Sequence, residues 1–174
     1  MVAPSTPAAV SVRAARPADV PAIAELSARF AAEDLLLSRT PAQIAGRVGE
    51  FLAAVNEVRL MGCVGLSRRR RGLLLYNLCV APDAQGQGIG ALLVDHAGRV
   101  GAALGCRLLV AVSKHSGHWF VQQGFTELTA RQMPAGWAHA FPPGRGSRLY
   151  VRPVTQPGFA EQSIYQNRTE SRNL

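Results

Sequence analysis

The stretch "VAPDAQGQGIGALL", Val80 to Leu93, decides the fold. An apolar strand pattern runs into Pro82, three glycines alternate with Gln and Ile, and a helical pattern of apolar residues follows. The first N–H groups of a helix have no partner within it and carry the positive end of its dipole, so bare glycine backbone there makes a pocket for phosphates. We therefore expect the main chain from Gln85 to Gly90 to hold a diphosphate.

Other glycine-rich loops fit this stretch less well. A Walker P-loop is excluded, because the stretch has no Lys and no Ser or Thr that could reach a magnesium ion. The dinucleotide fingerprint G-x-G-x-x-A is matched formally by Gly86 to Ala91. However, four residues separate the strand from its first Gly, and no acidic residue lies between Asp95 and Glu127 to hold a ribose. A strand-to-helix loop without a ligand remains open as a third alternative.

The chain of 174 residues is long enough to bury a core as one domain. Residues 1–11 are rich in Pro, Ala, Ser and Thr, and residues 155–174 are polar without a sustained period, so both are predicted as tails around a domain spanning residues 12–154. The intervening order of apolar patterns mixes helices and strands, which indicates an α+β fold in layers.

Local signals place the elements. Asp19 is predicted to cap a first helix through Phe30, and Thr40 to Gln43 form a capping box that opens a second helix through Leu52. Strands are predicted at 10–15, 52–57, 59–67, 73–81, 106–113 and 148–154, with the second to fourth forming an antiparallel meander. A long helix from Ile89 to Gly105 and a short one at 116–123 complete the prediction.

The net charge is +8 and comes from eighteen arginines and one lysine. Such a charge attracts anions, including nucleic acid, acidic metabolites and polyphosphate cofactors. The arginine run Arg68 to Arg71 lies between two apolar runs and ends at Gly72, which favours a hairpin turn with solvated side chains. No nucleic-acid partner is therefore expected.

The three cysteines, Cys63, Cys79 and Cys106, lie in apolar runs without C-x-x-C spacing. They are predicted to be core residues of a reduced, cytoplasmic protein, and no metal site is expected. No apolar run approaches the ~20 residues of a membrane span, and the first residues resemble no signal peptide. We expect no membrane association.

Two motifs show that the chain resembles the GNAT family of acetyl-CoA-dependent N-acetyltransferases. The strand end Leu78 to Pro82 and the loop Gln85 to Gly90 match a strand ending V-x-P followed by Q/R-x-x-G-x-G/A. A strand at 108–113, a short helix at 117–123 and the pair Gly124-Phe125 match a second family element. The resemblance implies a mostly antiparallel central sheet flanked by helices and splayed near Val80 to admit acetyl-CoA.

The resemblance also implies the coenzyme-binding residues. Backbone amides of the glycine loop hold the pyrophosphate, and the end of the preceding strand pairs with pantetheine like an added strand. The coenzyme-binding set is therefore predicted to be Leu78, Cys79, Val80, Gln85, Gly86, Gln87, Gly88, Ile89, Gly90 and Phe120.

A narrower resemblance is to the acetyltransferase domain of bacterial N-acetylglutamate synthases, carried by "HWFVQQGF" at 118–125 and "RGSRLYV" at 145–151. It implies acetylation of the α-amino group of L-glutamate, the first step of arginine biosynthesis, in a short stand-alone form without the amino-acid-kinase domain. The planar fork of Arg suits a dianionic amino acid. The predicted acceptor-binding residues are Arg39, Asn77, Lys114, Arg145 and Ser147.

Acetyl transfer needs an oxyanion donor, a neutral amine and a proton for the leaving thiolate. The backbone N–H of Val80 or Cys79 is the predicted oxyanion donor. A Tyr that protonates the thiolate in many family members is replaced by Phe120, and the proposed base of the glutamate synthases falls on Leu74. Polar groups nearby could relay a proton through water, and the predicted catalytic set is Val80, Cys79, Ser113 and Tyr76, with His115 and His118 as further relay groups.

Alternatives to glutamate acetylation remain open. The chain could acetylate another amino acid or an amino-acid-like toxin. From a different class, it could be a degenerate coenzyme A-binding or regulatory module, with Leu74 and Phe120 as signs of lost catalysis. The expected partner is a small-molecule amine, and the sequence leaves both a monomer and a homodimer open.

Overall fold

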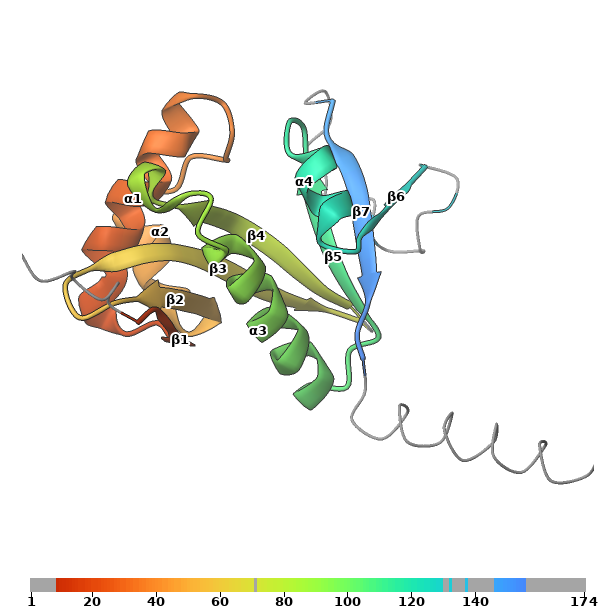
Figure 1. Cartoon of the computed structure of the whole chain (residues 1–174), viewed down its shortest axis with the longest axis horizontal. Helices are drawn as coiled ribbons and strands as arrows, with labels where there is room; N and C mark the ends of the chain where they lie inside the picture. The colour runs from red at the N-terminus through yellow and green to blue at the C-terminus, as the bar shows by residue number, and fades with distance from the viewer. Residues whose placement is uncertain (1–8, 71, 130–131, 133–136, 138–145, 156–174) are drawn as a thin grey trace, which may run out of the picture.

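One mixed sheet organises the molecule (Figure 1). The computed structural model describes residues 9–70, 72–129, 132, 137 and 146–155, and within them seven strands are ordered β1-β2-β3-β4-β5-β7-β6. Among these seven described strands, only β4 and β5 pair in parallel. The predicted fold class is confirmed. The strands are β1 Ser11–Ala14, β2 Phe51–Val55, β3 Leu60–Arg69, β4 Gly72–Val80, β5 Leu108–Ser113, β6 Thr126–Leu128 and β7 Arg148–Pro153.

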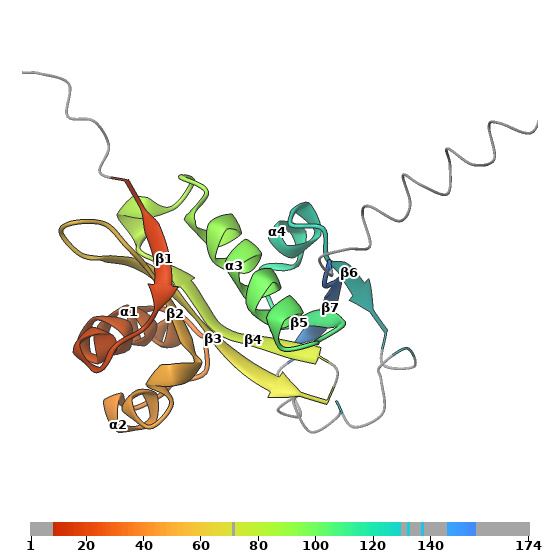
Figure 2. The ribbon, with the colours of Figure 1, turned by 90° about the horizontal axis from the view of Figure 1, so that it is seen from below.

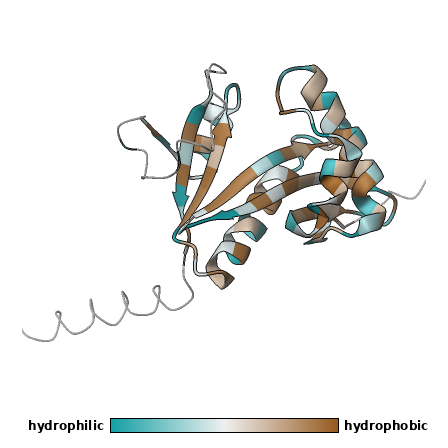
Figure 3. Ribbon diagram, turned by 180° about the vertical axis from the view of Figure 1, so that it is seen from behind, coloured by the Kyte–Doolittle hydropathy of each residue, from teal (hydrophilic) through white to brown (hydrophobic). Residues whose placement is uncertain are grey.

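Helices cover both faces of the sheet (Figure 2). The first two, α1 Val20–Ala32 and α2 Pro41–Ala45, lie on one face, and α3 Ile89–Ala103 and α4 Gly117–Gln122 lie on the other. Much of β3 and β4 is hydrophobic (Figure 3), and the buried side chains of these strands belong to the core between the layers. The fully buried side chains of this core include Ile23, Ile44, Phe51, Val64, Leu93 and Leu109.

The predicted arginine hairpin is confirmed. Strands β3 and β4 pair antiparallel as far as Arg69 and Gly72, and Arg70 has the positive φ of a tight turn, +47°. The side chains of Arg68 and Arg69 are exposed. Val80 lies at the opposite end of β4, so these cations lie far from the glycine loop.

The parallel pairing between β4 and β5 is short. It runs from Gly72 opposite Leu108 to Leu75 opposite Ala111, after which the strands diverge (Figure 1). The strands therefore separate after Leu75, earlier along β4 than the expected position near Val80. The two halves of the sheet diverge like the arms of a V toward the carboxyl ends of both strands.

A β-bulge in β4 lies at this opening. Cys63 pairs with Cys79 but Gly65 pairs with Tyr76, so two residues of β4 oppose one of β3. Asn77, one of the two, has φ of +52°, a conformation that Asn tolerates better than most residues. Its buried side-chain amide donates to Ser27 Oγ at 2.6 Å and so ties the bulge to α1. Bulges bend a strand and increase its twist, which turns this end of β4 away from β5.

The second helix is shorter than predicted. Its capping box is confirmed, because the Gln43 N–H donates to Thr40 Oγ1 at 3.2 Å and the Thr40 N–H donates to Gln43 Oε1 at 2.9 Å. The predicted continuation through Leu52 is wrong, since α2 ends at Ala45 and β2 begins at Phe51. The strand is buried between β1 and β3, so its apolar residues fall at helical spacing by coincidence. The three-residue β6 was not predicted.

Asp19 occupies the N-cap position of α1, as predicted, but makes no capping hydrogen bond with its side chain. Its carboxylate instead accepts from the guanidinium of Arg13 at 2.7 and 3.0 Å and from the Arg16 N–H at 2.7 Å. The hydrogen bonds from Arg13 hold the pKa of the Asp19 carboxyl below its ordinary value of 3.8. The side chain thereby links β1 to the start of α1.

This pair predicts an acid-dependent loss of stability. A carboxyl with a lowered pKa in the folded state stabilises the protein above its unfolded pKa, and this contribution disappears as the pH falls through the folded pKa. We expect Asp19→Asn to be less stable than the native protein at pH 7, with the difference shrinking at pH 3. Urea unfolding at both pH values measures it. An unchanged difference between pH 7 and pH 3 would show that the pair does not couple folding to this titration.

Candidate active site

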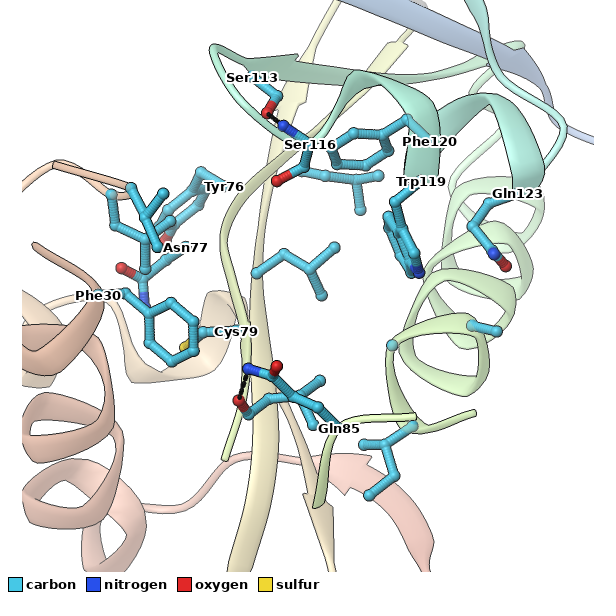
Figure 4. A pocket seen from close by; sticks show the side chains of 18 of the residues that line it. Phe30, Tyr76, Asn77, Cys79, Gln85, Ser113, Ser116, Trp119, Phe120 and Gln123 are labelled. Atoms are coloured by element: carbon cyan, nitrogen blue, oxygen red, sulfur yellow. Dashed lines mark hydrogen bonds between the residues drawn. The ribbon is translucent and has the colours of Figure 1, made fainter. Parts of the chain in front are cut away.

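A cleft of about 480 Å³ lies in the V between β4 and β5 (Figure 4). The second half of β4 forms one wall with the end of α1, and α4 forms the other. Figure 4 shows Phe30 and Tyr76 on the first wall, with Trp119 and Phe120 on the second. The glycine loop and the first turn of α3 close one end of this cleft.

The glycine loop has the backbone that the predicted diphosphate site requires. Gly86 and Gly88 have φ of +75° and +79°, the left-handed region that favours glycine. Gly88 is the N-cap of α3, and a Cβ at either glycine would project into open space. The N–H groups of the first helical turn therefore face the cleft end without a side chain in front of them.

Gly90 has a different explanation. A Cβ at this position would lie 2.8 Å from Cζ2 of Trp119, so its absence lets the indole of α4 pack against the first turn of α3. Sequence reasoning assigned all three glycines to phosphate binding. The close approach of Trp119 comes from an element about 30 residues away and has no local signal.

The unpaired edge of β4 offers one backbone donor to the cleft. Ala81 N–H donates to Met61 O at 2.8 Å, and pairing alternates along an antiparallel ladder. The N–H and C=O of Val80 therefore face the cleft, and those of Cys79 face β3. The side-chain amide of Gln85 donates to Val80 O at 3.3 Å, as the dashed line in Figure 4 shows. Of the two predicted oxyanion donors, Val80 is the one on the cleft side.

Two positions at which the family resemblance would put proton-transfer groups carry apolar side chains. Phe120 is buried, stacks on Tyr150 at 5.7 Å between ring centroids, and meets Phe125 edge-on at 5.3 Å. Leu74 packs against an apolar cluster that includes Val110. Both side chains are explained by packing, so proton transfer must use other groups.

A smaller cavity of about 140 Å³ adjoins the cleft. The two share part of their lining, which includes Tyr76, Val112 and Ser113. The structure brings four of the five predicted acceptor-binding residues to this cavity, and the fifth, Arg145, lies outside the described residues. The four are Arg39, Asn77, Lys114 and Ser147.

The cations of this cavity differ in their partners. Lys114 Nζ lies 3.0 Å from the Asp34 carboxylate. The guanidinium of Arg39 lies 4.8 Å from the ring centroid of Tyr76, and its Nη1 donates only weakly to Leu37 O at 3.4 Å. Half-burial lowers the pKa of Arg39, and no acidic side chain within the described lining pairs with it. Among the described residues, Arg39 is thus a partly desolvated cation that no ion pair neutralises, the arrangement expected of a carboxylate site.

Tyr76 has a hydroxyl that is already engaged. It donates to Glu50 Oε2 at 2.8 Å. Burial, together with this hydrogen bond, raises the pKa of Tyr76, so the hydroxyl stays protonated at neutral pH. Ser113 differs, because its Oγ accepts from the Ser116 N–H at 2.9 Å and keeps its own proton for another acceptor. The catalytic roles of both residues stay predictions.

The remaining relay groups lie apart from the site. His118 and His115 line neither cavity, and His118 Nε2 lies 3.1 Å from the Gln122 amide on α4. Among the described residues, no cluster of three or more His, Cys, Asp or Glu side chains could hold a metal ion. In the same part of the chain, no helix has both the length and the apolar character needed to cross a membrane.

Sequence comparisons agree with this geometry. Residues 47–127 match the family model described as an acetyltransferase (GNAT) domain. The chain is 29% identical over 146 residues to the amino-acid acetyltransferase of Neisseria meningitidis serogroup B, covering 82% of this chain and 34% of that protein. An uncharacterized N-acetyltransferase of Chlorobaculum tepidum is 29% identical over 124 residues, 71% of this chain and 79% of that one. This chain spans about a third of the length of the Neisseria relative.

Structural comparisons point the same way. N-acetylglutamate synthase from Neisseria gonorrhoeae, complexed with coenzyme A and N-acetyl-glutamate, superposes with a TM-score of 0.80 at 28% identity, over 87% of this chain and 36% of that one. Rv2747 from Mycobacterium tuberculosis shares the fold with a TM-score of 0.71 at 24% identity, over 83% of this chain and 99% of that one.

Proposed function

We propose, since this chain belongs to the GNAT acetyltransferases, that it transfers the acetyl group of acetyl-CoA to the α-amino group of a small amino acid that carries a carboxylate, with L-glutamate as the first candidate. With glutamate as the acceptor, the reaction is the first step of arginine biosynthesis and takes place in the cytoplasm. The names of the Neisseria relatives support an amino-acid acceptor.

The observation that carries the proposal is the state of Arg39. Its guanidinium is half-buried beside the cavity that adjoins the cleft, and Asp34, the acidic residue of the described lining, pairs with Lys114. A carboxylate of the acceptor would accept two parallel hydrogen bonds from this fork. Ser147, on the same cavity, offers a hydroxyl donor to the acceptor.

In the proposed reaction, the glycine loop and β4 bind the coenzyme, and residues at the junction of the two cavities act on the reacting groups. Acetyl-CoA supplies the activated acetyl thioester. The loop from Gly86 to Gly90 binds the diphosphate and thereby aligns the pantetheine arm with β4. The N–H of Val80, on the cleft side of the strand, stabilises the oxyanion. Ser113 lines both cavities, and in this proposal its hydroxyl relays a proton from water to the leaving thiolate and is itself reprotonated by that water. Asp34, the acidic residue in the described lining, is paired with Lys114, so the acceptor ammonium loses its proton to water.

Kinetics with a panel of amino acids test this proposal. We expect coenzyme A thiol release with glutamate, and Arg39→Ala to raise the KM for the acceptor at least about tenfold, the loss of one charge-assisted hydrogen bond. Coenzyme A affinity, measured by calorimetry, should stay at its native value. Arg99→Ala removes an exposed arginine of α3 and is the matched control, with no expected effect on either quantity.

Each other outcome has a defined meaning. An unchanged acceptor KM in Arg39→Ala would contradict the proposal that Arg39 binds a carboxylate of the acceptor. Turnover of a different amino acid, with the Arg39 effect retained, would keep the reaction and replace glutamate. Coenzyme A binding without any turnover across the panel would favour a degenerate coenzyme-binding module, which the apolar positions Leu74 and Phe120 would then explain.

A further inference from the structure

The ring of Tyr76 is held on several sides. A Cβ on Gly65 of the neighbouring strand would overlap Cε2 and Cζ of the ring, so the ring lies directly on the bare backbone of β3. Phe51 meets the ring edge-on, with 5.4 Å between centroids and 79° between planes. The hydroxyl donates to Glu50. These contacts leave the ring little freedom to move or tilt.

Arg39 lies over the same ring. Its guanidinium carbon is 4.8 Å from the ring centroid, and the side-chain hydrogen bond that it makes within the described part of the chain, to Leu37 O, is long at 3.4 Å. The carboxylate of Glu50, which accepts from Tyr76, pairs with the guanidinium of Arg47 at 3.8 Å. A guanidinium stacks favourably on an aromatic face, so the ring is the principal support of Arg39.

We propose that Tyr76 is a positioning residue for acceptor binding. Its ring presents the guanidinium of Arg39 to the smaller cavity, and Glu50 and Gly65 fix the ring. This inference rests on the proposed function, in which Arg39 binds a carboxylate of the acceptor. It assigns Tyr76 a role other than proton transfer, and it gives Glu50 and Gly65 a part in acceptor recognition.

The arrangement explains why a rigid support is needed. An arginine side chain has several rotatable bonds, and each bond that must be fixed on binding lowers affinity. A guanidinium already stacked on a fixed ring loses less freedom when it takes a carboxylate. The loop that carries Arg39 ends at the capping box of Thr40 and Gln43, which fixes the backbone close to this side chain.

Two replacements of Tyr76 separate support from chemistry. Tyr76→Phe keeps the ring and removes the hydroxyl, whereas Tyr76→Leu removes the ring. We expect the acceptor KM to rise about threefold in the first variant and about tenfold in the second, with the effect in KM rather than in kcat. The pH profile of kcat should keep its native shape in Tyr76→Phe. Calorimetry with coenzyme A, together with near-ultraviolet circular dichroism, establishes that both variants are folded.

A cycle with Arg39 gives an independent readout. Once Arg39 is Ala, Tyr76→Leu should add little to the acceptor KM, because the two residues act through one contact. A drop in kcat of Tyr76→Phe as large as that of Tyr76→Leu, with a shifted pH profile, would show that the hydroxyl takes part in chemistry and overturn the inference.

Failure of this inference is distinguishable from failure of the proposed function. Native acceptor KM in Tyr76→Leu alongside a raised KM in Arg39→Ala would overturn the support by the ring and leave the carboxylate site in place. Native acceptor KM in Arg39→Ala would overturn both.

Discussion

Gly88→Ala is expected to bind coenzyme A at least about a hundredfold more weakly than the native protein. Its φ of +79° is a conformation that costs an L-residue about 1–2 kcal/mol. The new methyl would also project into the space in front of the first turn of α3, where the diphosphate is expected to meet the backbone. Each charge-assisted hydrogen bond lost there weakens binding by about 1.5–3 kcal/mol. Calorimetric titration with coenzyme A measures the change.

Gly105→Ala is the matched control for this variant. Gly105 follows α3, has φ of +69°, and a Cβ there would meet nothing within 4 Å. We expect a similar loss of about 1–2 kcal/mol in the free energy of unfolding for both variants, and a loss of coenzyme affinity for Gly88→Ala alone. Native coenzyme affinity in Gly88→Ala would show that the loop is not the diphosphate site, and the proposed function would lose its basis.

Gly65→Ala is expected to lower the free energy of unfolding by about 1–3 kcal/mol and to raise the acceptor KM about tenfold. The added Cβ would overlap the ring of Tyr76, which Phe51 and Glu50 hold in place. The ring must therefore tilt or lift, and the guanidinium of Arg39 moves with it. Urea unfolding and acceptor kinetics measure the two effects on one sample.

The loss of stability caused by Gly65→Ala should depend on the presence of the Tyr76 ring. In a Tyr76→Leu background, Gly65→Ala should destabilise the protein much less, because the flexible leucine can move away from the new methyl. Gly49→Ala is the control substitution on a nearby segment, since a Cβ at Gly49 would meet nothing within 4 Å. Equal costs of Gly65→Ala in both backgrounds would contradict the overlap.

The features predicted from the sequence were those with a local signal. The glycine loop, the long helix after it and the capping box at Thr40 each depend on residues within about one turn of one another. The end of the second helix was wrong because apolar spacing alone does not distinguish a helical face from a strand buried on both sides. The bulge at Asn77 displaces the alternation by a single residue, too little to detect without the partner strand.

The candidate site was predicted unevenly for the same reason. Family resemblance identified Arg39 and Ser147, which the fold brings to one cavity from distant parts of the chain. It did not identify Glu50, because that residue falls in a segment predicted as helix and contacts Tyr76 across the intervening strand β3. The pairing of Lys114 with Asp34 joins residues 80 positions apart, and no pattern in the sequence reports it.

The short parallel ladder between β4 and β5 has a thermodynamic consequence. Four residue pairs join the β1–β4 half of the sheet to the half formed by β5, β7 and β6, and beyond them no strand of the described residues lies beside the edge of β4. A molecule that fills this gap takes the place of missing backbone partners, so it acts as an interior element of the protein. Coenzyme binding and stability are then coupled by mass action. The melting temperature rises as the ratio of the free coenzyme concentration to its Kd increases.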